Sequence, residues 1–209
     1  MPKHKTDVDG QTLLLWYPTA TPQSSYVRAA VKIESGAKSA LDPNTEAIIK
    51  PYVSDDLSEL DITVQAVTTA VPERTFWDKV VILHGLRRWY EKRSELRGGG
   101  QRVSRHYYDL HALLNSPVGG KAIRDPALCT ECVAHARLFF NRPDFDLASA
   151  ESGRFALIPR GDMVTALGRD YQAMSSMIFG QPPAFDAIIK SIRELEVSLN
   201  SAVHEDKAS

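Results

Sequence analysis

The stretch VPERTFWDKVVILHGLRRWYEKRSELRGGGQRVSRHYYDLHALL spans Val71–Leu114, and the rest of the chain is organised around it. It contains two helical patterns joined by a glycine-rich, basic link. Thr75 and Asp78 resemble a capping box at the start of the first helix, whereas Pro72 and Glu73 suit a first turn if the helix starts earlier. On that helix, apolar residues recur at steps of three and four from Lys79; they are Phe76, Ile82, Leu83, Leu86 and Tyr90. The spacing therefore centres a lysine on the face that packs against the protein.

Lys79 is unusual because it lies on an apolar helix face. Removing an unpaired ammonium from water is costly, so Lys79 needs a carboxylate, a phosphate or a hydrated cleft beside it. Alternatively, its side chain runs along the edge of the core and keeps the ammonium in water. The spacing alone leaves both interpretations open.

The second helix is predicted from about Ser104 to Leu114, with Ser104 as its N-cap. Asp109 shares one side of this helix with Arg105 and His106, which lie one turn earlier. Arg105 and Asp109 are spaced as an i,i+4 ion pair, which on a surface contributes little stability. Tyr107 and Leu114 are expected to supply the packing face.

Cationic side chains dominate the region between the two helices. The whole chain has a formal net charge of -1, so these cations form a local basic patch. Such a patch favours contact with phosphates, although cations at a helix end also complement its dipole. Gly98-Gly99-Gly100 lacks the pattern of a Walker loop and is interpreted as a flexible linker. The cations are Arg87, Arg88, Lys92, Arg93, Arg97, Arg102 and Arg105.

Before this stretch, the sequence predicts a few short strands. The most informative is Tyr26–Ser35, in which alternation directs Glu34 to the face opposite the core, beside two cations. Alternating charge of this kind is also common on the solvent side of antiparallel sheets. The expected core residues of this strand are Val27, Ala29, Val31 and Ile33. The other strands are expected at residues 11–18, near Ile48–Val53 and at Asp61–Ala70.

After Leu114, proline and glycine residues at positions 115–120 break the chain, and three further helices are predicted. They span about residues 126–140, 162–178 and 184–202, and Asp125 and Pro126 are the predicted N-cap and first-turn proline of the first one. In the first of them, Cys129, Cys132 and His135 have a spacing that could hold a metal. With no fourth ligand in view, small buried cysteines explain the pattern better.

Composition and length set the broad class. The 209 residues are 43% hydrophobic and 24% charged, as in ordinary globular proteins. No apolar run is long enough for a membrane helix, and two cysteines with no signal peptide suggest a reducing cytoplasm. Strands followed by helices predict an α+β fold. We expect residues 1–70 to form a sheet region and residues 71–209 a helical region that carries Lys79 and Asp109.

PERTFWDKVVILHG followed by SRHYYDLHALL resembles the AbiEii/AbiGii toxin family, the nucleotidyltransferases of AbiE-type abortive-infection systems. The similarity continues upstream through QTLLLWYP and YVRAAVKIESGAKS, and more weakly through LIPRGDMVTALGRDYQAM. It implies a partial polymerase-β-like nucleotidyltransferase sheet followed by a helical half. It also implies a toxin that acts in phage defence and is controlled by a cognate antitoxin.

The resemblance implies transfer of a nucleotide from an NTP to an RNA such as tRNA, with Mg²⁺. Paired metals hold the attacking and leaving oxygens, and cations neutralise the triphosphate. By position, Glu34 would be a metal-binding carboxylate and Lys79 would bind the phosphates. Asp109 would orient Lys79 or a substrate group, and Arg105 would support phosphate binding. RNA contacts would come from Arg87, Arg88, Arg93, Arg97 and Arg102.

One departure from the family pattern keeps a second interpretation open. A Gly-Ser motif followed by Asp-x-Asp is expected well upstream of Glu34, but Asp7-Val8-Asp9 is preceded by MPKHKT alone. We interpret this Asp-x-Asp as coincidental. The alternatives are a truncated, inert relative that binds a partner or RNA, or half of a split enzyme that a second chain completes.

Overall fold

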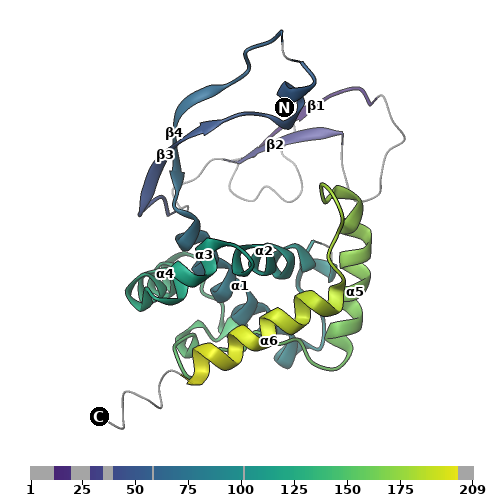
Figure 1. The fold of residues 1–209 in the computed structure, drawn as a ribbon. Helices are drawn as coiled ribbons and strands as arrows, with labels where there is room; N and C mark the ends of the chain where they lie inside the picture. The colour runs from purple at the N-terminus through teal and green to yellow at the C-terminus, as the bar shows by residue number, and fades with distance from the viewer. Residues whose placement is uncertain (1–11, 20–28, 35–39, 58, 101, 202–209) are drawn as a thin grey trace. The chain divides into compact units, whose positions relative to one another are not determined.

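The computed structural model describes residues 12–19, 29–34, 40–57, 59–100 and 102–201. The chain divides into two compact units, Met1–Ala40 and Leu41–Ser209. Short antiparallel strands precede a largely helical remainder (Figure 1), which confirms the predicted α+β class. The second unit contains one strand pair in addition to the described helices. The division into a sheet region at residues 1–70 and a helical region at residues 71–209 stays a prediction.

In the first unit, β1 (Thr12–Trp16) pairs antiparallel with β2 (Ala30–Glu34). Both elements are predicted by the sequence, but the expected core face of β2 is partly wrong. Ala29 is buried, whereas Val31 and Ile33 are exposed. The described part of this unit is a two-stranded sheet, and it supplies no second layer against which Val31 and Ile33 could be buried.

In the second unit, β3 (Asn44–Ile49) pairs antiparallel with β4 (Val64–Ala70). The strand predicted at Asp61–Ala70 begins three residues before β4 and ends with it. The strand predicted near Ile48–Val53 lies about four residues later than β3. The chain after β3 forms a 3-10 turn, Tyr52–Asp55, which follows Pro51. Proline has no N–H to donate to a strand ladder, so β3 ends before it.

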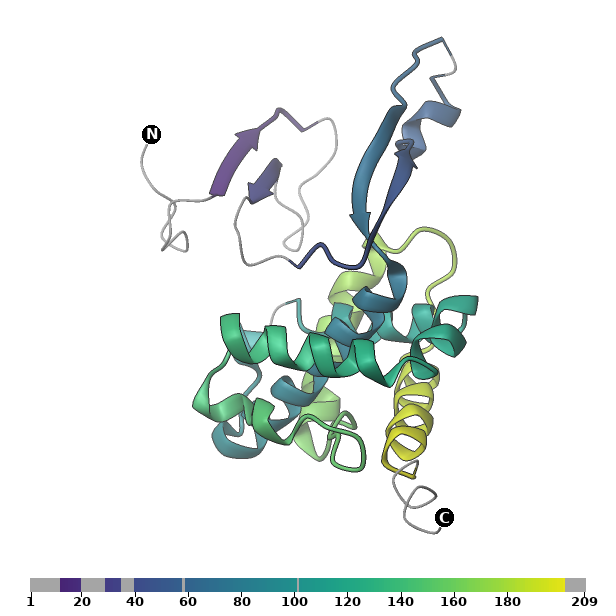
Figure 2. The same cartoon turned by 90° about the vertical axis from the view of Figure 1, so that its left-hand side faces the viewer.

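β4 leads directly into α1 (Pro72–Arg93), the longest helix (Figure 2). Pro72 occupies the first turn, where its missing N–H costs nothing. The expected capping box is wrong because the helix begins at Pro72, which places Thr75 inside it. Ser94 ends the helix in the left-handed conformation, and its N–H donates to the Tyr90 carbonyl oxygen at 2.8 Å.

The helix α2 (Ser104–Leu114) has the predicted bounds, although its N-cap is Val103 rather than Ser104. The break predicted at residues 115–120 is wrong, because this segment contains the start of a short helix, α3 (Pro117–Ile123). The Ser116 side chain caps α3 by accepting the Val118 N–H at 3.2 Å. Proline in the first turn and a serine N-cap favour this helix despite its two glycines.

The remaining helices are α4 (Pro126–Phe139), α5 (Asp162–Met174) and α6 (Phe185–Ser201). The Asp125 side chain caps α4, as predicted, by accepting the Leu128 N–H at 3.0 Å. Two 3-10 turns, Pro143–Phe145 and Leu147–Ser149, lie in the connection between α4 and α5.

α1 is central to the helical packing of the second unit. Figure 2 shows α1 against α2, α3 and α4, while α5 and α6 pack against α2. Phe76, Trp77 and Leu83 of α1 are almost fully buried, and the Trp77 indole donates to the Ala122 carbonyl oxygen of α3 at 3.1 Å. The α1–α2 contact brings the two predicted motifs side by side. None of the described helices is long and apolar enough to cross a membrane.

Candidate functional site

Lys79 of α1 and Asp109 of α2 form the centre of the candidate site. The Lys79 ammonium lies 2.6 Å from Asp109 Oδ2, and the two side chains are 19% and 38% exposed. Lys79 therefore lies at the edge of the core, as one of the two interpretations expects, but its ammonium also has a carboxylate partner. This partner comes from the other predicted motif, 30 residues along the chain.

His106 completes this cluster, although no role was predicted for it. Its Nδ1 lies 3.4 Å from Lys79 Nζ. Because an ammonium can only donate, Nδ1 accepts and the ring hydrogen lies on Nε2. Burial, together with the charges of Lys79, Arg105 and Arg97, lowers the pKa of His106 to about 3. His106 is therefore a neutral imidazole at physiological pH.

The cluster carries an excess of positive charge. Lys79, Arg97 and Arg105 all act electrostatically on His106, and Asp109 is the carboxylate that pairs with Lys79. The expected Arg105–Asp109 ion pair does not form among the described residues, and Arg105 is exposed. A surface with several cations around a neutral imidazole suits an anionic ligand such as phosphate.

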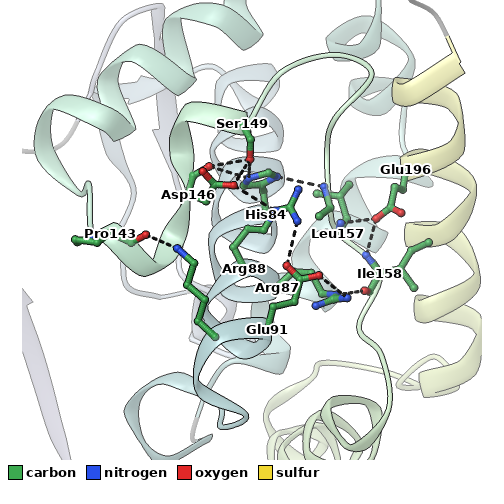
Figure 3. Close-up of polar contacts among 12 residues, drawn as sticks. His84, Arg87, Arg88, Glu91, Pro143, Asp146, Ser149, Leu157, Ile158 and Glu196 are labelled. Carbon is green, nitrogen blue, oxygen red and sulfur yellow. Dashed lines mark hydrogen bonds and ion pairs between the residues drawn. The ribbon is translucent and has the colours of Figure 1, made fainter.

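Two of the five arginines predicted to contact RNA, Arg87 and Arg88, are buried or half-buried and bind groups within the protein. Buried Arg87 donates from Nε to the Ile158 carbonyl oxygen at 2.8 Å, and its Nη2 lies 2.9 Å from Glu91 (Figure 3). Arg88 donates to the same carboxylate at 3.0 Å. Arg87 therefore has a structural role, because its guanidinium joins α1 to the segment before α5. Contact of either arginine with RNA stays a prediction.

The other three arginines are exposed. Arg93 pairs with Asp144 at 2.6 Å, and the Arg97 guanidinium lies 5.2 Å from the centre of the Phe145 ring. Arg102 begins the approach to α2, and its backbone N–H donates to Asp170 Oδ1 at 2.7 Å. Their exposure is compatible with phosphate contact, which also stays a prediction.

Glu34, the predicted metal ligand, lies in β2 of the first unit. Its carboxylate is exposed and lies 2.5 Å from Lys32 Nζ. Asp7 and Asp9 lie outside the described residues, as does Val27 of the expected core face. The assignment of Glu34 to a metal therefore remains a prediction.

The two cysteines of the C-x-x-C-x-x-H pattern are buried and form no disulfide, as predicted for small core residues. Burial raises the pKa of Cys129 and of Cys132 to about 12, so both thiols are protonated at neutral pH, as expected of small buried side chains. The His135 ring packs against Phe139, with 4.8 Å between the ring centres. Across the described ranges, no group of three or more His, Cys, Asp or Glu side chains is arranged to hold a metal ion.

A second polar cluster joins His84 of α1 to Ser149 and Asp146 (Figure 3). The residue types suggest nucleophilic catalysis, but the hydrogen bonds do not. His84 Nδ1 accepts the Ala156 N–H at 3.2 Å, so the ring hydrogen lies on Nε2, which faces Ser149 Oγ at 3.2 Å. An imidazole in this state cannot take the proton of Ser149. The cluster is a buried connection between α1 and the loop after α4, and burial lowers the pKa of His84.

Comparison with known proteins agrees with the resemblance seen in the sequence. The model of one protein family matches residues 2–191; its description is nucleotidyl transferase AbiEii toxin, Type IV TA system. The match covers both helices of the candidate site and both strand pairs. No curated protein and no solved structure matches the chain.

Proposed function

The chain belongs to this family of nucleotidyltransferase toxins, and we propose that it transfers a nucleotide from an NTP to an RNA acceptor such as tRNA. The observation that carries the proposal is the 2.6 Å contact between Lys79 and Asp109. It joins the two motifs that the family resemblance assigns to the active site. Membership of a toxin–antitoxin family also implies a cognate antitoxin.

Lys79 is the proposed ligand of the triphosphate. Its ammonium has three N–H donors; Asp109 and His106 Nδ1 accept two of them among the described residues. A third donor is left for a phosphate oxygen. Asp109 holds the ammonium in place, while Arg105, exposed one turn earlier on α2, adds positive charge. These charges would stabilise the negative charge that develops on the phosphates during transfer.

The family resemblance also implies Mg²⁺, which would neutralise charge on the phosphates and so lower the barrier to transfer. The described residues do not fit this ion on their own, because no group of three or more candidate ligands comes together. Asp109, which could offer a carboxylate, is already paired with Lys79. The proposal therefore assigns phosphate binding and orientation to the Lys79 cluster, and no step of it passes through a metal.

The acceptor RNA is proposed to contact the exposed arginines on and beside the link between α1 and α2. Arg93, Arg97 and Arg102 have exposed side chains on or next to the link between α1 and α2. Contacts of this kind neutralise backbone phosphates without reading sequence. They would hold an RNA near the NTP, while the choice of acceptor would depend on its shape.

The test is RNA labelling by the purified full-length chain with Mg²⁺ and each radiolabelled NTP. Lys79→Ala should reduce labelling about 100-fold or more, because it removes the proposed phosphate ligand. Lys190→Ala is the matched control: Lys190 is exposed on α6 and pairs weakly with Glu194 at 3.9 Å. Labelling by Lys79→Ala at the wild-type rate would refute the assigned role.

A second candidate function is binding without catalysis, and an exposed aromatic pair favours it. Tyr52 and Phe179 are 80% and 86% exposed, and their rings are stacked with 5.4 Å between centres. Large exposed aromatic side chains often mark interaction surfaces. An inert chain would bind RNA or a partner protein but leave RNA unlabelled. If labelling appears only when a second chain is added, the protein is half of a split enzyme.

A further inference from the structure

The carboxylate of Asp170, on α5, lies against the start of α2. Its Oδ1 accepts the Arg102 N–H at 2.7 Å. Its Oδ2 accepts the Val103 and Ser104 N–H groups at 2.8 and 2.7 Å, and also the Ser104 hydroxyl at 2.7 Å. Asp170 is 8% exposed, so these four bonds form in a nearly dry environment.

These bonds do for α2 what a local N-cap does for other helices. The first N–H groups of a helix have no partner within the helix, and a negative charge there also complements the helix dipole. The N-cap of α2, Val103, has no side chain that can accept a hydrogen bond. Arg102 precedes it with φ of 62°, a conformation that non-glycine residues seldom adopt. Asp170 therefore determines where the link ends and the helix begins.

The first turns of α2 carry the side chains that meet Lys79. His106 follows Ser104 by two residues, and Asp109 lies one turn later. The packing face of α2, with Tyr107 and Leu110 fully buried, sets which side of the helix faces α1 and α5. Apolar contacts tolerate small slides and rotations, whereas four directional bonds at one end restrict them. The geometry of the site thus depends on a residue that does not touch it.

We propose that Asp170 is a positioning residue for the candidate site: by fixing the first turn of α2, it holds His106 and Asp109 at Lys79. The effect on RNA labelling rests on the proposed function, whereas the effect on the geometry of the cluster does not. Loss of Asp170 should loosen the cluster while leaving every residue of the cluster itself present.

The direct experiment is NMR of the His106 imidazole in the full-length chain at pH 5.5. In the wild type, His106 should be neutral with its hydrogen on Nε2, because Lys79, Arg105 and Arg97 act on it in a buried setting. In Asp170→Asn, the carboxylate is lost, the cluster loosens, and a substantial fraction of His106 should be protonated. This measurement requires no enzymatic activity.

Glu196→Gln is the matched control. The Glu196 carboxylate, on α6, also accepts two backbone N–H groups, those of Leu157 and Ile158 (Figure 3). Its loss should lower stability in a similar way but leave His106 neutral. In the RNA-labelling assay, Asp170→Asn should lower kcat/KM for the NTP about 10- to 100-fold, and Glu196→Gln should leave it close to wild type.

The two proposals fail separately. If the wild type labels no RNA, the proposed function is wrong, but the state of His106 still decides the role of Asp170. If His106 stays neutral in Asp170→Asn, the positioning role is overturned. If Asp170→Asn does not fold, Ser104→Ala is the alternative variant, because it removes one of the four bonds. It should raise the protonated fraction of His106 at pH 5.5, but by less than Asp170→Asn would. An unchanged His106 in that variant would also overturn the proposal.

Discussion

Lys79 and Arg87 are cations on the same helix, yet their surroundings differ. The Arg87 guanidinium is buried and satisfied by Glu91 and a backbone carbonyl. Lys79 keeps 19% of its side chain exposed and has one carboxylate partner. A buried and fully satisfied cation is suited to joining elements, whereas a half-buried one with a spare donor can bind a ligand. This difference separates the two residues, although both lie on α1.

At the same scale, His106 should make stability depend on pH. Its pKa is about 3 in the folded chain and about 6.5 when unfolded, so the unfolded chain binds more protons below pH 6.5. Above pH 6.5, His106 is neutral in both the folded and the unfolded chain and does not oppose folding. As the pH falls from 6.5 towards 3, protonation of His106 in the unfolded chain lowers the free energy of unfolding. The free energy of unfolding of the wild type should therefore fall between pH 7 and 5, with about 1 to 2 kcal/mol of the loss due to His106.

His106→Asn removes this titration and should make the decline shallower by that amount, as measured by urea unfolding at pH 7, 6 and 5. The comparison variant is His111→Asn. His111 is also on α2, and burial lowers its pKa to a lesser degree. Equal slopes for the wild type and His106→Asn would contradict the neutral, buried state assigned to His106.

At the scale of elements, α3 depends on a glycine that the sequence suggests is a helix breaker. A Cβ at Gly119 would lie 2.8 Å from the Leu114 Cα and 3.1 Å from the Leu113 carbonyl oxygen. Both are backbone atoms, so α2 or α3 would have to move. Gly119→Ala should therefore lower the free energy of unfolding by about 1 to 3 kcal/mol, as measured by urea unfolding.

Gly120→Ala is the neighbouring control, because a Cβ there meets nothing within 4 Å. Alanine is favoured over glycine in a helix, so this variant should gain about 0.5 to 1 kcal/mol. Destabilisation by both variants would mean that the backbone of α3, rather than the close approach at Gly119, sets the outcome.

The features of the helices that could be predicted from the sequence depend on residues close together in the chain. Periodic apolar spacing gives the bounds of α2, and Asp125 is a correct N-cap for α4 because its partner is three residues away. The cap of α2 is a carboxylate 66 residues further along, and no local pattern contains it. The Lys79–Asp109 contact was reachable through the family pattern. His106 was missed because its role depends on which ring nitrogen faces Lys79.

At the scale of the whole molecule, the buried apolar side chains lie almost entirely in the second unit. Among the described residues, Ala29 is the buried apolar residue that precedes Leu41. The exposed apolar side chains of the first strand pair include Leu13, Leu15, Val31 and Ile33. Burial of apolar surface is the main favourable term in folding, so the second unit should contain most of the stability of the chain.

A fragment of residues 41–209 should therefore unfold cooperatively, with a Tm within about 4 °C of the full chain, because a loss of roughly 1 kcal/mol shifts Tm by that much. Scanning calorimetry of the two proteins gives the comparison. The fragment keeps Lys79, His106 and Asp109 but lacks Glu34, so it should bind NTP in equilibrium dialysis without labelling RNA. A broad, non-cooperative transition would show that the first unit contributes to the core. RNA labelling by the fragment would show that transfer needs no carboxylate from the first forty residues, and the role predicted for Glu34 would then be wrong.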